Sequence, residues 1–181
     1  MKKFLVLLLL IPFVSMAQYS VEVFNNRVMI NGILNVDTFL VESQSNIVQL
    51  DVQEQKIDVE FHSKDARLVS EAAVRYHDES EDVDVEVFFS GSYSWLIDYL
   101  ISDAPELNRT DEISIRIEEN EQSVPVRMTF NRLPSNTNKH LSIMQISGNI
   151  DPEYFGLNHD DYYFIEDLNF IIKLTIRFAQ H

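Results

Sequence analysis

The stretch NFIIKLTIRF, residues 169–178, alternates between apolar and polar side chains. Every second residue from Phe170 to Phe178 is apolar, and Lys173, Thr175 and Arg177 stand between them. Successive side chains of a β-strand point to opposite faces of a sheet. The pattern therefore predicts a strand with one buried face and one solvated face.

The same two-residue period recurs upstream, in residues 82–87, 113–117 and 124–130. Less regular segments of the same kind are Ser20–Phe24, Arg27–Leu34, Thr38–Glu42, Ile47–Val52, Lys56–His62 and His140–Gly148. In the last of these the apolar phase shifts between Ile143 and Met144, which predicts a β-bulge. Turn residues such as Asn25-Asn26 and Glu119–Glu121 separate several segments. We expect about ten short antiparallel strands, in a sandwich or a barrel.

Two stretches break the alternation. In Ser94–Ile101, Trp95, Leu96, Tyr99 and Leu100 share one face of a helix, with Ser92 or Ser94 as a predicted cap and Pro105 beyond the end. The stretch Asp65–Tyr76 fits either a helix or a strand followed by a loop.

The chain begins with the features of an export signal. Met1-Lys2-Lys3 is basic, Phe4–Val14 is apolar, and Ser15-Met16-Ala17 has small residues at both peptidase positions. We predict cleavage after Ala17, a mature domain over residues 18–181, and a periplasmic or extracellular location. The apolar run is too short to span a bilayer, which needs about 20 residues.

The amino-acid composition excludes several classes of function. Apolar residues make up 45% of the 181, enough for a substantial core, and the absence of cysteine excludes disulfides, cysteine zinc sites and thiol catalysis. The formal net charge of −15 becomes −17 once Lys2 and Lys3 leave with the signal. The chain therefore lacks the basic footprint of a nucleic-acid-binding protein.

No catalytic motif or cofactor fingerprint stands out, so we expect a non-catalytic protein without a cofactor or metal. His159 beside Asp160 and Asp161 is the best cluster for general base chemistry. Two alternatives stay open for these residues. The protein is a hydrolase that uses His159, or the three residues form a simple polar loop.

Four segments resemble the YceI-like family, particularly Bacteroidetes-type variants. Residues 28–39, VMINGILNVDTF, resemble the family's opening strand and the short segment after it. Leu141–Gly148, followed by Asp151–Leu157 with its Phe155-Gly156 turn, is similar to the late strand and turn of the family. Asn169–Phe178 is similar to the closing strand.

This resemblance implies an all-β, lipocalin-like antiparallel barrel of about eight to ten strands with one or two short helices. It also implies that an isoprenoid or fatty-acyl lipid is held in an apolar interior. The aromatic residues that would line such an interior are Phe39, Phe61, Phe89, Trp95, Tyr99, Phe130, Phe155 and Phe170. Trp95 and Tyr99 are the strongest candidates, because their helix would lie across one barrel end.

The alternation is equally compatible with a barrel whose side chains fill it completely. In that case the protein is an acidic envelope interaction module that binds a basic partner protein and no small ligand.

Overall fold

The computed structural model describes residues 19–44, 46–51, 54–79, 85–102, 104–134, 139–158 and 161–180. The predicted signal peptide, residues 1–17, lies outside these residues, as do His159 and Asp160.

Antiparallel β-structure dominates the described part of the chain. The strands are β1 (Tyr19–Leu34), β2 (Asp37–Ser43), β3 (Ile47–Asp51), β4 (Lys56–His62), β5 (Arg67–Leu68), β6 (Glu86–Ser92), β7 (Glu106–Ile117), β8 (Asn120–Leu133), β9 (Lys139–Ile150) and β10 (Leu168–Gln180). The helical segments are a 3-10 turn η1 (Ser63–Asp65), α1 (Glu71–Glu79) and α2 (Leu96–Ile101).

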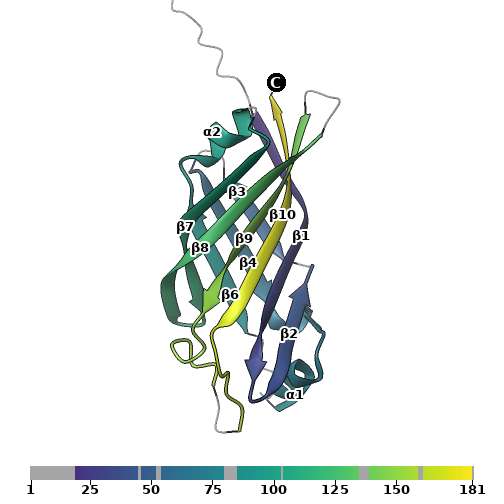
Figure 1. Cartoon of the computed structure of the whole chain (residues 1–181), viewed down its shortest axis with the longest axis vertical. Helices are drawn as coiled ribbons and strands as arrows, with labels where there is room; N and C mark the ends of the chain where they lie inside the picture. The colour runs from purple at the N-terminus through teal and green to yellow at the C-terminus, as the bar shows by residue number, and fades with distance from the viewer. Residues whose placement is uncertain are drawn as a thin grey trace, which may run out of the picture.

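All ten strands belong to one sheet, in the order β3-β4-β6-β7-β8-β9-β10-β1-β2-β5. The sheet curls strongly into a barrel-like shape, with α2 near the end where the chain terminates and α1 at the opposite end (Figure 1). Its two edge strands, β3 and β5, are not paired with each other, but β1 and β3 approach within 8 Å between Cα atoms. A single curled sheet confirms the predicted all-β barrel-like fold with two short helices and excludes the sandwich.

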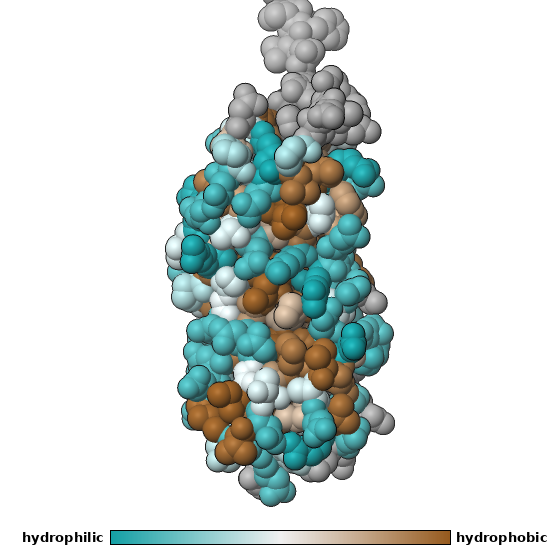
Figure 2. All heavy atoms as spheres, turned by 45° about the vertical axis from the view of Figure 1, so that its right-hand side comes forward, coloured by the Kyte–Doolittle hydropathy of each residue, from teal (hydrophilic) through white to brown (hydrophobic). Residues whose placement is uncertain are grey.

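The alternation decides which side chains face the interior. In β10, Phe170, Ile172, Leu174 and Ile176 are at most 1% exposed, whereas Lys173 lies on the outer face. The inward side chains of β4 and β6 to β9 join the same hydrophobic core. Outside, Figure 2 shows a mostly hydrophilic face interrupted by separate hydrophobic patches.

Two local predictions about strands are wrong for identifiable reasons. Asn25 and Asn26 do not separate two strands; they form a bulge inside β1, with Asn25 at a φ of 51°. Strand β9 pairs with both neighbours without a register shift. Its apparent phase change arises because Ser142 occupies an inward position and is 1% exposed, which places Ile143 outside.

The two stretches that break the alternation are both helical in part. Helix α2 begins after Trp95 without a side-chain cap, so the predicted serine cap is wrong. The stretch Asp65–Tyr76 contains both alternatives, the short strand β5 and most of α1. None of the helices among the described residues has the length and apolar character needed to cross a membrane.

Candidate functional site

A cavity of about 90 Å³ lies inside the sheet at the α1 end. Its walls come from almost every element that reaches this end, and nearly all of its lining atoms are apolar. The lining residues are Ile30, Phe39, Val41, Phe61, Ser63, Ala66, Leu68, Ala73, Tyr76, His77, Val85, Val87, Ile117, Ile150, Leu157, Phe164 and Leu168.

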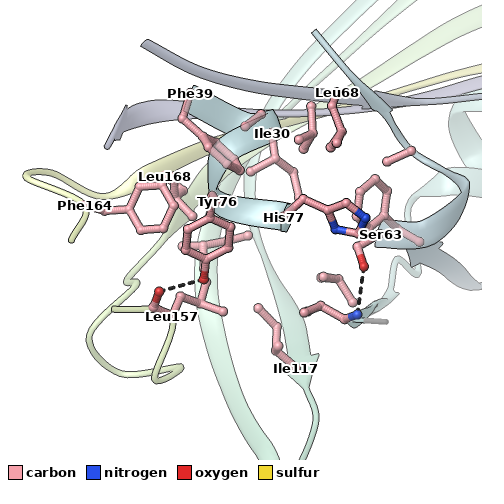
Figure 3. A pocket seen from close by; sticks show the side chains of 17 residues that line it. Ile30, Phe39, Ser63, Leu68, Tyr76, His77, Ile117, Leu157, Phe164 and Leu168 are labelled. Atoms are coloured by element: carbon pink, nitrogen blue, oxygen red, sulfur yellow. Dashed lines mark hydrogen bonds between the residues drawn. The ribbon is translucent and has the colours of Figure 1, made fainter. Parts of the chain in front are cut away.

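Aromatic rings form one wall of this cavity (Figure 3). The Phe39 ring packs edge-on against Phe164 at 5.1 Å and against Tyr76 at 5.8 Å between centroids. Tyr76 and Phe164 are themselves 5.6 Å apart. These three rings join β2, α1 and the β9–β10 connection, so the wall depends on three segments that are distant in sequence.

The polar groups at the cavity are few and engaged with the protein. The Tyr76 hydroxyl donates a hydrogen bond of 2.7 Å to the Leu157 carbonyl (Figure 3). Burial raises the pKa of Tyr76 from 10.0 to about 12 because the phenolate would lose its hydration. The Ser63 hydroxyl accepts a hydrogen bond of 2.8 Å from the Val85 N–H, and His77 lies beside it. A cavity of this kind can hold an apolar group but offers little to orient a polar one.

Helix α1 covers the cavity and is fixed to β2 by polar contacts. Ser70 precedes the helix, and its hydroxyl accepts hydrogen bonds from the N–H groups of Ala73, at 3.2 Å, and of Leu40, at 3.0 Å. The first is the bond of an N-cap. Arg75 forms an exposed ion pair with Asp37. Ala73 and Tyr76 then face the interior from the helix.

Buried aromatic side chains pack against one another in the opposite half of the interior. Phe89 and Phe170 are fully buried and pack at 5.1 Å between ring centroids. Near α2, Phe130 is enclosed by Trp95 at 5.5 Å and by Tyr99 at 5.0 Å. The Trp95 indole donates a 2.8 Å hydrogen bond to Asp111, which fixes its orientation.

The eight aromatic residues predicted to contact a ligand are thus divided between different parts of the molecule. Phe39 and Phe61 line the cavity. Trp95, Tyr99 and Phe130 form a cluster at the α2 end, and Phe89 packs with Phe170 in the core between. Phe155 is buried against Tyr154 and is not among the lining residues. That any of the eight contacts a ligand stays a prediction.

Sequence reasoning missed Tyr76, Leu157 and Phe164 as cavity residues. Tyr76 ends the stretch that fits a helix, and the apolar face of that helix, which Ala72 and Ala73 share, is the signal that could have identified it. Leu157 and Phe164 lie in an irregular connection, where no periodic pattern marks the inward side chains.

Comparison with known proteins gives a match in structure alone. No family model matches the sequence, and no curated protein matches it. A solved structure described as a polyisoprenoid binding domain from Saccharophagus degradans, implicated in plant cell wall breakdown, superimposes with a TM-score of 0.57. The identity is 6%, and the match covers 91% of this chain and 99% of that chain. The chain shares the fold of that domain. The match therefore confirms the YceI-like fold predicted from the sequence.

Proposed function

We propose that this protein is a non-catalytic carrier that binds an isoprenoid or fatty-acyl chain in the cavity beneath α1. The observation that supports it most is an apolar cavity inside a fold shared with a polyisoprenoid-binding domain. Burying about 300 Å² of apolar ligand surface would contribute about 7 kcal/mol before ordering costs. Such a gain requires no polar recognition.

The size of the cavity implies that the ligand must enlarge it. An apolar cavity of about 150 Å³ holds benzene, and ligand pockets usually measure about 300–1,000 Å³. The cavity here has about 90 Å³. We infer that α1 and the β9–β10 connection separate when the chain enters, because they form the wall that is not part of the main sheet. Tyr76 and Phe164 would then lie along the ligand.

Native mass spectrometry of protein purified gently from its own envelope tests this function. A discrete added mass that disappears on organic extraction supports a bound lipid, and the mass defines the type of chain. A bare mass that persists after incubation with prenyl and acyl lipids contradicts the proposal. It would favour the acidic interaction module with a basic partner.

Two half-buried alanines at opposite ends of the molecule provide a matched pair of variants. Ala66 lines the cavity, whereas Ala104 follows α2. Ala66→Phe would fill the cavity and should weaken binding of a radiolabelled prenyl or acyl chain at least tenfold. Ala104→Phe adds the same bulk at the α2 end and should leave the affinity unchanged. Equal affinities for both variants would place the ligand elsewhere.

We further propose that the protein acts outside the cytoplasm after removal of residues 1–17. Fractionation of the source cells, followed by N-terminal sequencing, should yield a mature chain that begins at Gln18. Recovery of the intact N-terminus from the cytoplasmic fraction would contradict export and leave the ligand proposal untouched.

A further inference from the structure

A group of metal-ligating side chains lies on the outer surface of the wall that encloses the cavity. Glu60 and His62 are two residues apart on β4 and so project from the same face of the sheet. Glu86 on β6 is the cross-strand partner of His62. Phe61 and Val87, their neighbours in sequence, point inward and line the cavity. The alternation of two paired strands thus brings the three polar side chains together outside.

The three side chains converge closely enough to share one ion. One ligand atom from each of Glu60, His62 and Glu86 lies within 4.8 Å of the other two. The His62 Nε2 atom is 2.5 Å from Glu60 Oε1, so these two groups are already in contact. Both are about three-quarters buried, with side-chain exposures of 22% for His62 and 27% for Glu60. Partial burial limits the competition from water for whatever binds there.

We propose that Glu60, His62 and Glu86 form a binding site for a divalent transition metal, with Zn²⁺ as the best fit. Zn²⁺ accepts both imidazole nitrogen and carboxylate oxygen as ligands, and water can complete the tetrahedron around three protein ligands. The imidazole distinguishes the group from a simple acidic patch, which would suit Ca²⁺ or Mg²⁺. Within the described ranges, it is the one place where three histidine or carboxylate side chains meet in this way.

The position of the site gives a bound ion a structural consequence. His62 is the last residue of β4 and Glu86 the first of β6. Between them the chain departs from these two strands to form η1, β5 and α1, and β5 pairs with β2 at the other edge of the sheet. A bound metal would cross-link β4 and β6 at the points where the chain leaves the first strand and enters the second. The inference depends on the outer face alone and stands whether or not a lipid binds inside.

Isothermal titration of the mature protein with ZnCl₂ tests the site. We expect one saturable site in the wild type. Loss of an outer-shell partner of a metal ligand typically costs 10–100-fold in affinity. The direct ligand variants His62→Ala and Glu86→Gln should therefore bind Zn²⁺ at least about tenfold more weakly. Glu22→Gln is the matched control. Glu22 is an exposed carboxylate on β1 that pairs with Arg177 on β10, away from the proposed site.

Two further measurements keep the result interpretable. Circular dichroism without metal should show that Glu86→Gln, which changes an exposed side chain, melts like the wild type. Added Zn²⁺ should raise the melting temperature of the wild type and of Glu22→Gln, and not that of Glu86→Gln. Absence of saturable binding in the wild type, or equal affinity in all variants, would overturn the proposal.

Discussion

At the scale of single residues, Gly148 makes room for an aromatic ring. A Cβ atom at this position would lie 2.9 Å from two ring carbons of Phe170 and 3.0 Å from a Val126 methyl group. Gly148→Ala should therefore lower the free energy of unfolding by about 1–3 kcal/mol, the usual cost of overpacking a core. Urea denaturation would measure it. In combination with Phe170→Leu the loss should be smaller than the sum of the two single losses, and strict additivity would contradict the steric cause.

Because of Tyr76, the stability of the folded protein should depend on pH in the alkaline range. Its pKa is raised to about 12, so the unfolded chain loses the phenolic proton near pH 10 while the folded protein keeps it. The contribution of Tyr76 to the free energy of unfolding is therefore complete below pH 10 and declines as the pH rises toward 12. Tyr76→Phe removes the hydrogen bond to Leu157, so its free energy of unfolding at pH 7 should be about 0.5–1.5 kcal/mol lower than that of the wild type.

The same variant should show a shallower decline of stability between pH 9 and 11 than the wild type, by about the contribution of one tyrosine. Denaturant titrations at a series of pH values would measure both slopes. Identical slopes would mean that Tyr76 ionises as freely in the folded protein as in the unfolded chain. Burial also raises the pKa of Tyr93, so part of the decline in stability should remain in both proteins.

At the scale of elements, the bulge in β1 joins the two sides of the curled sheet. The Asn26 side chain donates to the Asn46 carbonyl at 3.1 Å, and the Asn46 amide donates to Asn26 Oδ1 and to the Ser43 carbonyl. Asn46→Asp keeps the shape but removes the amide donors, so unfolding should become easier by about 1–3 kcal/mol. Asn131→Asp, on an exposed strand position, is the control. A similar change in both variants would show that added charge, rather than the lost bonds, is responsible.

The cover of the cavity depends on the start of α1. Ser70→Ala removes the N-cap bond to Ala73 and leaves the Leu40 N–H without its acceptor, at a cost of about 1 kcal/mol. Hydrogen exchange should accelerate across residues 71–79 while β7 and β8 remain protected. If the cover controls access, release of a bound prenyl chain should accelerate in parallel. Faster exchange with unchanged release would separate the two and indicate another path of entry.

Most elements could be predicted because a period of two is visible in the sequence. Strand β4 begins and ends where the alternation of Lys56–His62 predicts. The errors occur where a residue of unexpected polarity decides the geometry. Ser142 is buried in a position expected to be apolar, and Asn25 takes a left-handed conformation that keeps β1 continuous. The inward position of Ser142 is set by its pairing with Ile176 on β10 and Arg132 on β8, which the local sequence does not reveal.

At the scale of the whole molecule, the site was less predictable than the fold. Phe39, Tyr76 and Phe164 meet only after β2, α1 and the β9–β10 connection have been assembled. The sequence identified the inward faces, but every barrel has inward faces along its whole length. Where a cavity forms along the interior depends on side-chain volumes summed across strands. The cavity described here lies at the α1 end, whereas the α2 end, which the sequence favoured, contains the Phe130 cluster.

The net charge leads to a prediction that concerns the entire molecule. A formal charge of −15, or −17 without Lys2 and Lys3, makes the compact state repel itself. Raising NaCl from 0.02 to 0.3 M at pH 7.5 shortens the Debye length to below about 10 Å and should stabilise the fold. If screening contributes about 1 kcal/mol, the melting temperature rises by about 2–4 °C. Near pH 4.5, where carboxylates are partly protonated, the same salt step should have much less effect. An equal rise at both pH values would show that salt acts through apolar burial instead of through charge.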